Sequence, residues 1–123
     1  MPEIDNFFEG QPFTRRLFEA ARSMVRIIGP VEIKVTRSQI AFKRRGGFAW
    51  TWMPDRYLYK EAAPHVLNIS LRRRDLSPRW KQVVEPQPRR FMHRLEMFSV
   101  DDLEEAITPL LAEACESAGL HSL

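Results

Sequence analysis

Hydrophobic residues recur every three or four positions in two stretches, one towards each end of the chain. The first stretch begins after Pro12, a residue suited to the first turn of a helix, and stops at Gly29-Pro30, which ends helices. Spacing of this kind places the apolar side chains on one side of a helix. The pattern therefore predicts an amphipathic helix over residues 12–28, with an apolar stripe of Leu17, Phe18, Ala21, Met24, Val25 and Ile28.

The second stretch follows Ser99-Val-Asp-Asp102, where a serine and an acidic residue three positions later are typical of a helix start. The pattern predicts a C-terminal helix with Pro109 inside it. Because proline removes a backbone hydrogen bond within a helix, we expect a kink there, or two helical pieces that share one direction. The apolar stripe of this helix consists of Leu103, Ile107, Leu110, Leu111 and Ala114.

Between these helices, hydrophobic residues alternate with polar or small ones. Alternation is typical of half-buried strands, because successive side chains of a strand point to opposite faces of the sheet. The pattern predicts an α+β fold: a mainly antiparallel sheet of about five strands, with the N-terminal and the C-terminal helix packed on one face and the other face more exposed. The expected strands lie around residues 31–36, 40–42, 48–52, 65–72 and 91–97.

Length and composition limit the class of protein. A chain of 123 residues fits one domain, residues 1–123, with an irregular arm at 1–10 and a frayed tail at 119–123. The single cysteine, Cys115, excludes an internal disulfide framework and a multi-cysteine zinc site. No apolar run is long enough to span a bilayer, and no secretory signal is visible. We therefore expect a cytoplasmic protein that has no membrane partner.

A basic hairpin is the feature of the sequence that most suggests a function. Lys43, Arg44 and Arg45 lead into Gly46-Gly47, a pair that can supply the positive φ angles of a tight turn. The next strand carries large aromatic residues at alternate positions, which we expect on one face of the sheet. These aromatic residues are Phe48, Trp50 and Trp52. Their rings either stack on a ligand beside the cationic tip or fill the hydrophobic core.

Residues 75–90 contain three prolines and are expected to form a long, structured loop around Trp80. Long loops in compact domains are often functional. The simpler interpretation is a flap in which Trp80 and Val83-Val84 cover the edge of the core.

The net charge of +3 hides a strong segregation of charge along the chain. Residues 34–94 hold 15 of the 19 Lys and Arg residues but only 4 of the 16 Asp and Glu residues, a net charge of +11 against −8 for the two ends together. A basic middle can attract phosphates or an acidic partner. Alternatively, the acidic helices and the basic strands neutralise each other within one fold.

Four segments together resemble a bacterial family of uncharacterised domains, domain-of-unknown-function family 5655. They are Val35-Thr-Arg-Ser-Gln-Ile-Ala-Phe42, Arg44-Arg-Gly-Gly-Phe-Ala-Trp50, Ser77-Pro-Arg-Trp80, and His93 ahead of Asp101-Asp102-Leu103. The resemblance implies a small protein, or a domain of the kind found at the C-termini of larger proteins, and it implies no established activity. Many relatives in this family have two adjacent histidines where this chain has His93-Arg94.

Two groups of residues are candidates for binding. Cations on the hairpin and in the arginine runs are expected to contact an anionic partner, and a second group could line a pocket for an anionic small molecule between the loops 55–64 and 75–90. The first group is Lys43, Arg44, Arg45, Arg72, Arg73, Arg74, Arg89 and Arg90; the second is Arg37, Arg56, Tyr57, Trp80 and His93.

Catalytic, metal-binding and cofactor-binding patterns are not visible. His65 and His93 lie on separate expected strands with nothing in the sequence to fix their distance, and Gly46-Gly47 is not followed by a phosphate-loop lysine. The sequence therefore favours a non-catalytic binding module over an enzyme. Its expected partner is nucleic acid; the alternatives are a protein partner or homodimer bound by the uncovered sheet face, or a small molecule.

Overall fold

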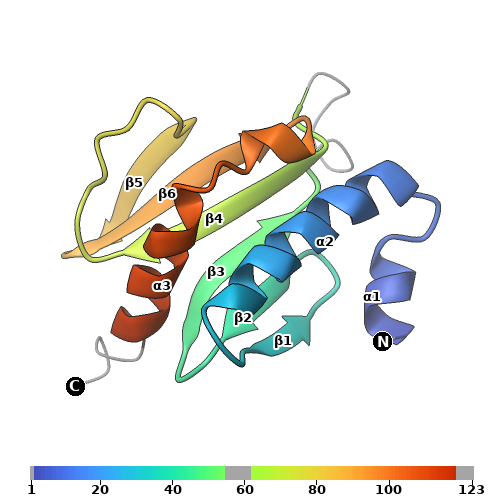
Figure 1. The fold of residues 1–123 in the computed structure, drawn as a ribbon, viewed down its shortest axis with the longest axis horizontal. Helices are drawn as coiled ribbons and strands as arrows, with labels where there is room; N and C mark the ends of the chain where they lie inside the picture. The colour runs from blue at the N-terminus through green and yellow to red at the C-terminus, as the bar shows by residue number, and fades with distance from the viewer. Residues whose placement is uncertain (1, 55–61, 119–123) are drawn as a thin grey trace.

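The computed structural model of the chain describes residues 2–54 and 62–118. Its strands form an antiparallel sheet in the order β1-β2-β3-β4-β6-β5, and the helices lie across one face of that sheet (Figure 1). The helices are α1 (Pro2–Phe7), α2 (Pro12–Ile27), the 3-10 helix η2 (Val100–Asp102) and α3 (Ile107–Ser117). The strands are β1 (Glu32–Val35), β2 (Ile40–Lys43), β3 (Gly47–Trp52), β4 (His65–Leu71), β5 (Gln82–Gln87) and β6 (Arg90–Met97).

The predicted α+β fold, with its antiparallel sheet and its N- and C-terminal helices, is confirmed. Helix α2 occupies the predicted span and buries its apolar stripe at Leu17, Phe18, Ala21 and Val25. Helix α3 begins at Ile107, so Pro109 lies in its first turn and the expected kink is wrong. The region does form two helical pieces, η2 and α3, but they are separated at residues 103–106 and not at Pro109. The first N–H groups of a helix have no partner within it, so a proline there costs no hydrogen bond.

Residues 1–10 are not the irregular arm that we predicted. Pro2–Phe7 form helix α1, which contacts β1 and buries Ile4 and Phe7. Glu3 and Asp5 lie in its first turn, where the helix dipole favours negative charge. This short stretch of acidic and apolar residues was too brief to show a helical period, so the contact with the sheet decides its structure.

The loop predicted at residues 75–90 contains a sixth strand. Val83 pairs with His93 and Val84 with Met92, and the register shifts between Val84 and Gln87. Strand β5 is at the edge of the sheet, and Pro86 falls within the shift. Proline is tolerated at an edge or a bulge because no ladder hydrogen bond is lost there. Trp80 covers the core as predicted, since it is 8% exposed and belongs to the core, and Val83 packs against it. Val84 does not take the predicted part in this cover, because it is 42% exposed.

The core lies between the helices and one face of the sheet. Strand β2 contributes Ile40 and Phe42, strand β4 contributes Leu67, Ile69 and Leu71, and strand β6 contributes Leu95 and Met97. Phe18 of α2 stacks on Phe42 with 6.1 Å between ring centroids. These residues alternate along each strand, as the sequence pattern predicts, and the residues between them point to the face that the helices do not cover.

Gly29 ends α2 in a conformation that other residues rarely adopt. Its φ is +125°, and a Cβ atom placed there would lie 2.7 Å from Nη2 of Arg44. We expect Gly29→Ala to lower the free energy of unfolding by about 1–3 kcal/mol, the usual cost of a strained backbone. Urea denaturation followed by circular dichroism measures this change. Gly10→Ala is the matched control, because Gly10 has a φ of +72° but nothing within 4 Å of the new Cβ. Equal costs at the two positions would contradict the extra cost expected at Gly29 from its larger φ and its contact with Arg44.

Candidate functional site

Two tryptophans lie on the sheet face that the helices leave uncovered. Trp50 pairs with Ala41 of β2 and Asn68 of β4, while Trp52 pairs with Val66. Their neighbours on β3, Ala49 and Thr51, are fully buried on the helix face. The prediction that Phe48, Trp50 and Trp52 share one face is therefore wrong. The pairing shifts between Phe42–Ala49 and Lys43–Gly47, which leaves Phe48 as an extra residue and turns it into the core.

Gly47 makes room for Trp50. A Cβ atom at Gly47 would lie 2.6 Å from Cζ2 of the Trp50 indole, so the ring rests against the glycine backbone. Gly47 does not have the positive φ that we expected from the Gly-Gly pair; the described glycines with positive φ are Gly10 and Gly29. Glycine is needed here because the ring approaches the backbone closely.

An arginine of β6 lies over each of these tryptophans. The guanidinium carbon of Arg90 is 5.7 Å from the Trp50 ring centroid, and that of Arg94 is 5.3 Å from the Trp52 ring centroid. Both distances are within the range of a cation–π contact. Neither arginine forms an ion pair with a carboxylate of the described residues. The uncovered face therefore combines aromatic rings with two arginines that form no ion pair with a carboxylate of the described residues.

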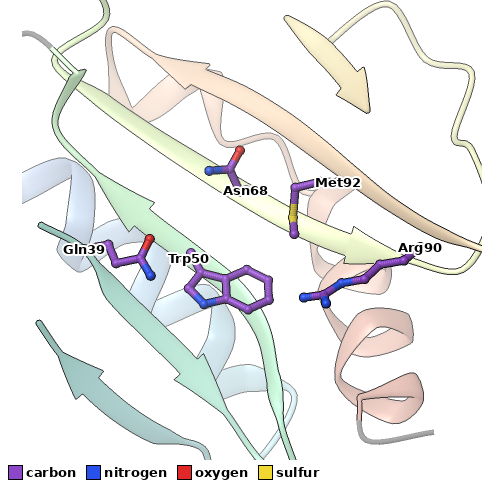
Figure 2. Close-up of a pocket in the computed structure, with 5 residues that line it drawn as sticks. All are labelled: Gln39, Trp50, Asn68, Arg90 and Met92. Carbon is purple, nitrogen blue, oxygen red and sulfur yellow. The ribbon is translucent and has the colours of Figure 1, made fainter. Parts of the chain in front are cut away.

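Two open hollows lie beside the tryptophans. One of about 230 Å³ is lined by Gln39, Trp50, Asn68, Arg90 and Met92 (Figure 2). A second, of about 390 Å³, is lined by Ser38, Gln39, Trp52 and Asn68. Figure 2 shows the five residues of the first hollow projecting from the sheet with the helices behind it. The hollows thus share Gln39 and Asn68.

The predicted hairpin tip is only partly available to a ligand. Arg44 donates from Nε to the carbonyl of Pro30 at 3.2 Å and from Nη2 to that of Ile28 at 3.3 Å. It therefore binds carbonyl groups at the end of α2, where a cation is favoured. Lys43 is partly exposed at the end of β2, and Arg45 is exposed.

The other predicted cations lie at several places. Arg73 forms a two-pronged ion pair with Glu113 of α3, at 2.9 and 2.8 Å, while Arg74 lies over the Phe91 ring. Arg72 lines a hollow with Glu113 and two other residues of α3. Arg89 has a φ of +63° in the turn between β5 and β6, and its N–H donates to Glu85. Of the eight predicted cations, only Arg90 contacts a tryptophan of the uncovered face.

The structure brings together two of the predicted pocket residues. The ring centroids of Trp80 and His93 are 5.0 Å apart, at an edge-to-face angle of 66°. Arg37 lies elsewhere, in a hollow lined by α1 and the turn after β1. Because β1 and β5 are opposite edges of the sheet, Arg37 and Trp80 are not in one pocket. Arg56 and Tyr57 lie outside the described residues.

His93 is held by the backbone through both ring nitrogens. Its Nε2 accepts the N–H of Asp75 at 2.9 Å, and its Nδ1 lies 3.0 Å from the carbonyl of Phe91, so the neutral ring with hydrogen on Nδ1 satisfies both contacts. Burial lowers the pKa of His93, which also favours the neutral ring. The carboxylate of Asp75 accepts the indole N–H of Trp80 at 2.8 Å. This network orders the segment between β4 and β5 and leaves His93 no nitrogen for acid–base chemistry.

Metal-ion clusters and membrane-spanning helices are both absent from the described part of the chain. No group of three or more His, Cys, Asp or Glu residues is placed to hold a metal ion. No helix among the described residues is long and apolar enough to cross a membrane.

Sequence reasoning missed four residues of this surface: Gln39, Asn68, Met92 and Arg94. These four residues alternate with core residues along a strand or lie next to a strand end. The alternation of the sequence therefore indicates only that they lie on the outer face of the sheet. Their shared location depends on β6 pairing with β4, about 25 residues earlier in the chain, and no local signal specifies that pairing. Asn68, a polar residue within an apolar strand, was the one available hint.

Comparison with known proteins identifies a family. The chain matches "Domain of unknown function (DUF5655)" over residues 4–118, which covers nearly all of it. Searches of curated proteins and of solved structures give no match. The predicted resemblance is thus confirmed, and the chain belongs to the DUF5655 family of domains of unknown function.

Proposed function

We propose that this protein is a binding module for single-stranded nucleic acid and that the uncovered face of its sheet is the binding surface. The observation that carries the proposal is the pair of tryptophans, Trp50 and Trp52, each beneath an arginine of β6. Proteins that bind single strands combine aromatic rings, on which bases stack, with cations that contact the phosphates.

The spacing of the two tryptophans supports this function. They are two residues apart on β3 and point to the same face, so their Cα atoms are roughly 6.7 Å apart along the strand. Two neighbouring bases of an extended single strand can therefore each meet one ring, or the guanidinium plane above it. A double helix has its bases stacked inside and cannot make these contacts, so the proposal requires unpaired bases.

A second candidate function uses the same surface. Val84, 42% exposed, pairs with Met92 on this face, and the apolar area extends from the tryptophans to the β5 edge. Such a face could instead bind a second copy of the chain. This interface would be apolar and tolerant of salt, whereas binding of nucleic acid weakens steeply as salt rises.

Fluorescence anisotropy with labelled 12-nucleotide single strands and a matched duplex, at several salt concentrations, tests the proposal. We expect the single strand to bind more tightly, and Trp50→Leu with Trp52→Leu to weaken binding at least tenfold, because stacking contributes about 1–3 kcal/mol per base. Replacing Arg90 and Arg94 by Gln should lower the slope of log K against log salt by about 1.4, since each phosphate contact contributes about 0.7.

Lys43→Gln with Arg45→Gln is the matched control, because it removes the same charge from the hairpin tip. If the hairpin variant loses binding and the sheet-face variants do not, the tip is the binding site, as the sequence alone suggested. Sedimentation of each variant shows whether the face dimerises. A dimer that persists in high salt, together with no binding to any strand, would favour the second candidate.

A further inference from the structure

The two hollows of the uncovered face share a pair of side-chain amides. Gln39 precedes β2, and Asn68 lies in the middle of β4, an inner strand of the sheet. Asn68 pairs with Trp50 on one side and with Arg94 on the other. The carboxamide of Asn68 therefore lies between Trp50 and Arg94 on this face and lines both hollows.

The amides of Gln39 and Asn68 are available to a ligand. Among the described residues, the side-chain amide of neither residue takes part in a hydrogen bond. Gln39 uses only its backbone, with its N–H donating to Thr36 at 3.2 Å. By contrast, Asp75 and His93 use their polar atoms within the protein. Each free amide offers one acceptor oxygen and two N–H donors in one plane.

We infer that this face selects among bases and favours adenine, with Asn68 as the residue that reads the base edge. The inference rests on the proposed binding of single-stranded nucleic acid. Adenine presents a donor and an acceptor side by side, at N6 and N7, which match the oxygen and the N–H of an amide. Guanine presents two acceptors, O6 and N7, at that edge, and pyrimidines have no N7 edge.

Asn68 suits this role better than Gln39 does. It has one rotatable bond fewer, and its backbone is held by strands on both sides, so its amide loses less freedom on binding. A base stacked on Trp50 lies in the hollow that Asn68 lines, which brings the base edge towards the amide. Gln39 lines both hollows and can serve the neighbouring base.

Binding of single-stranded 12-mers of dA, of dT and of 7-deaza-dA to the full chain, measured by anisotropy at one salt concentration, tests the inference. We expect dA to bind about tenfold more tightly than dT. The 7-deaza strand, which stacks but lacks N7, should bind no more tightly than dT. Asn68→Leu should weaken dA binding about tenfold and leave dT binding unchanged. Gln82→Leu is the matched control, because it removes an amide from the same face at the β5 edge.

Each outcome separates the inference from the function on which it rests. Equal binding of dA, dT and 7-deaza-dA would overturn the base selection and leave the proposed function intact. No binding to any of the three strands would overturn the proposed function itself. The comparison of dA with 7-deaza-dA uses the unaltered protein, so it remains decisive if Asn68→Leu does not fold.

Discussion

Phe48→Ala is expected to lower the free energy of unfolding by about 3–5 kcal/mol, whereas Trp50→Ala should lower it by about 1 kcal/mol. Phe48 is fully buried in the core, and its loss leaves a cavity between the sheet and the helices. Trp50 is larger but only partly buried on the open face, where its removal costs a cation–π contact and some apolar contact. The smaller ring therefore carries the larger effect.

Guanidinium chloride denaturation of both variants, followed by far-ultraviolet circular dichroism, provides the measurement. Near-ultraviolet dichroism of folded Trp50→Ala shows whether the rest of the core keeps its packing. If Trp50→Ala costs as much as Phe48→Ala, Trp50 belongs to the core. The bulge at Phe48 would then be wrong, and the tryptophans would not form the proposed binding surface.

Acidification from pH 7 to pH 4 is expected to remove about 3 kcal/mol of stability through His65 alone. His65 is fully buried, 6.2 Å from the ring of Phe8, and neither ring nitrogen has a hydrogen-bond partner among the residues that the structure describes. Burial lowers the pKa of His65 from 6.5 to about 4, because the charged ring cannot be solvated there.

The direction of this pH effect follows from where the proton binds. Above pH 6.5 the ring is neutral in both the folded and the unfolded chain, so stability does not depend on it. Between pH 6.5 and about 4, the unfolded chain binds a proton that the folded chain excludes, and stability falls as pH falls. Below about pH 4 both states bind the proton, and no further loss comes from this residue.

His65→Leu tests the assignment, because it keeps an apolar volume at the site and removes the titrating group. The variant should be at least as stable as the natural chain at pH 7, since two unpaired polar atoms are gone from the core. Its stability should fall less between pH 6.5 and 4. Parallel curves for the two proteins over that range would show that His65 does not cause the loss. His93→Gln controls for the other buried histidine, whose pKa is also lowered.

The charge segregation of the sequence has two outcomes in the structure. Arg73 and Arg79 pair with Glu113 and Glu104, so part of the basic middle is neutralised by the acidic C-terminal segment. Arg90 and Arg94 have no such partner among the described residues and lie on aromatic rings instead. Counting charges along the chain could not separate these groups, because an ion pair depends on distance in space.

Local patterns of the chain were enough to predict the elements that have a clear period. The stripe of α2, the stop at Gly29, the alternation along β4 and β6, and the coverage of one sheet face all follow from periods of 3.6 and 2. The same patterns missed α1 and β5, which are too short or too rich in proline to show either period.

The residues of the candidate surface depend on strand pairing, which local patterns do not reveal. The bulge at Phe48 adds one residue to β3, so Phe48 faces the core while Trp50 and Trp52 face the other side of the sheet. A simple alternation of residues cannot reveal a bulge, so the sequence placed all three rings on one face. Pairing of β6 with β4 then brings Arg90 and Arg94 over tryptophans about 40 residues earlier in the chain. Such contacts depend on strand order and register, which the packing of the whole core selects.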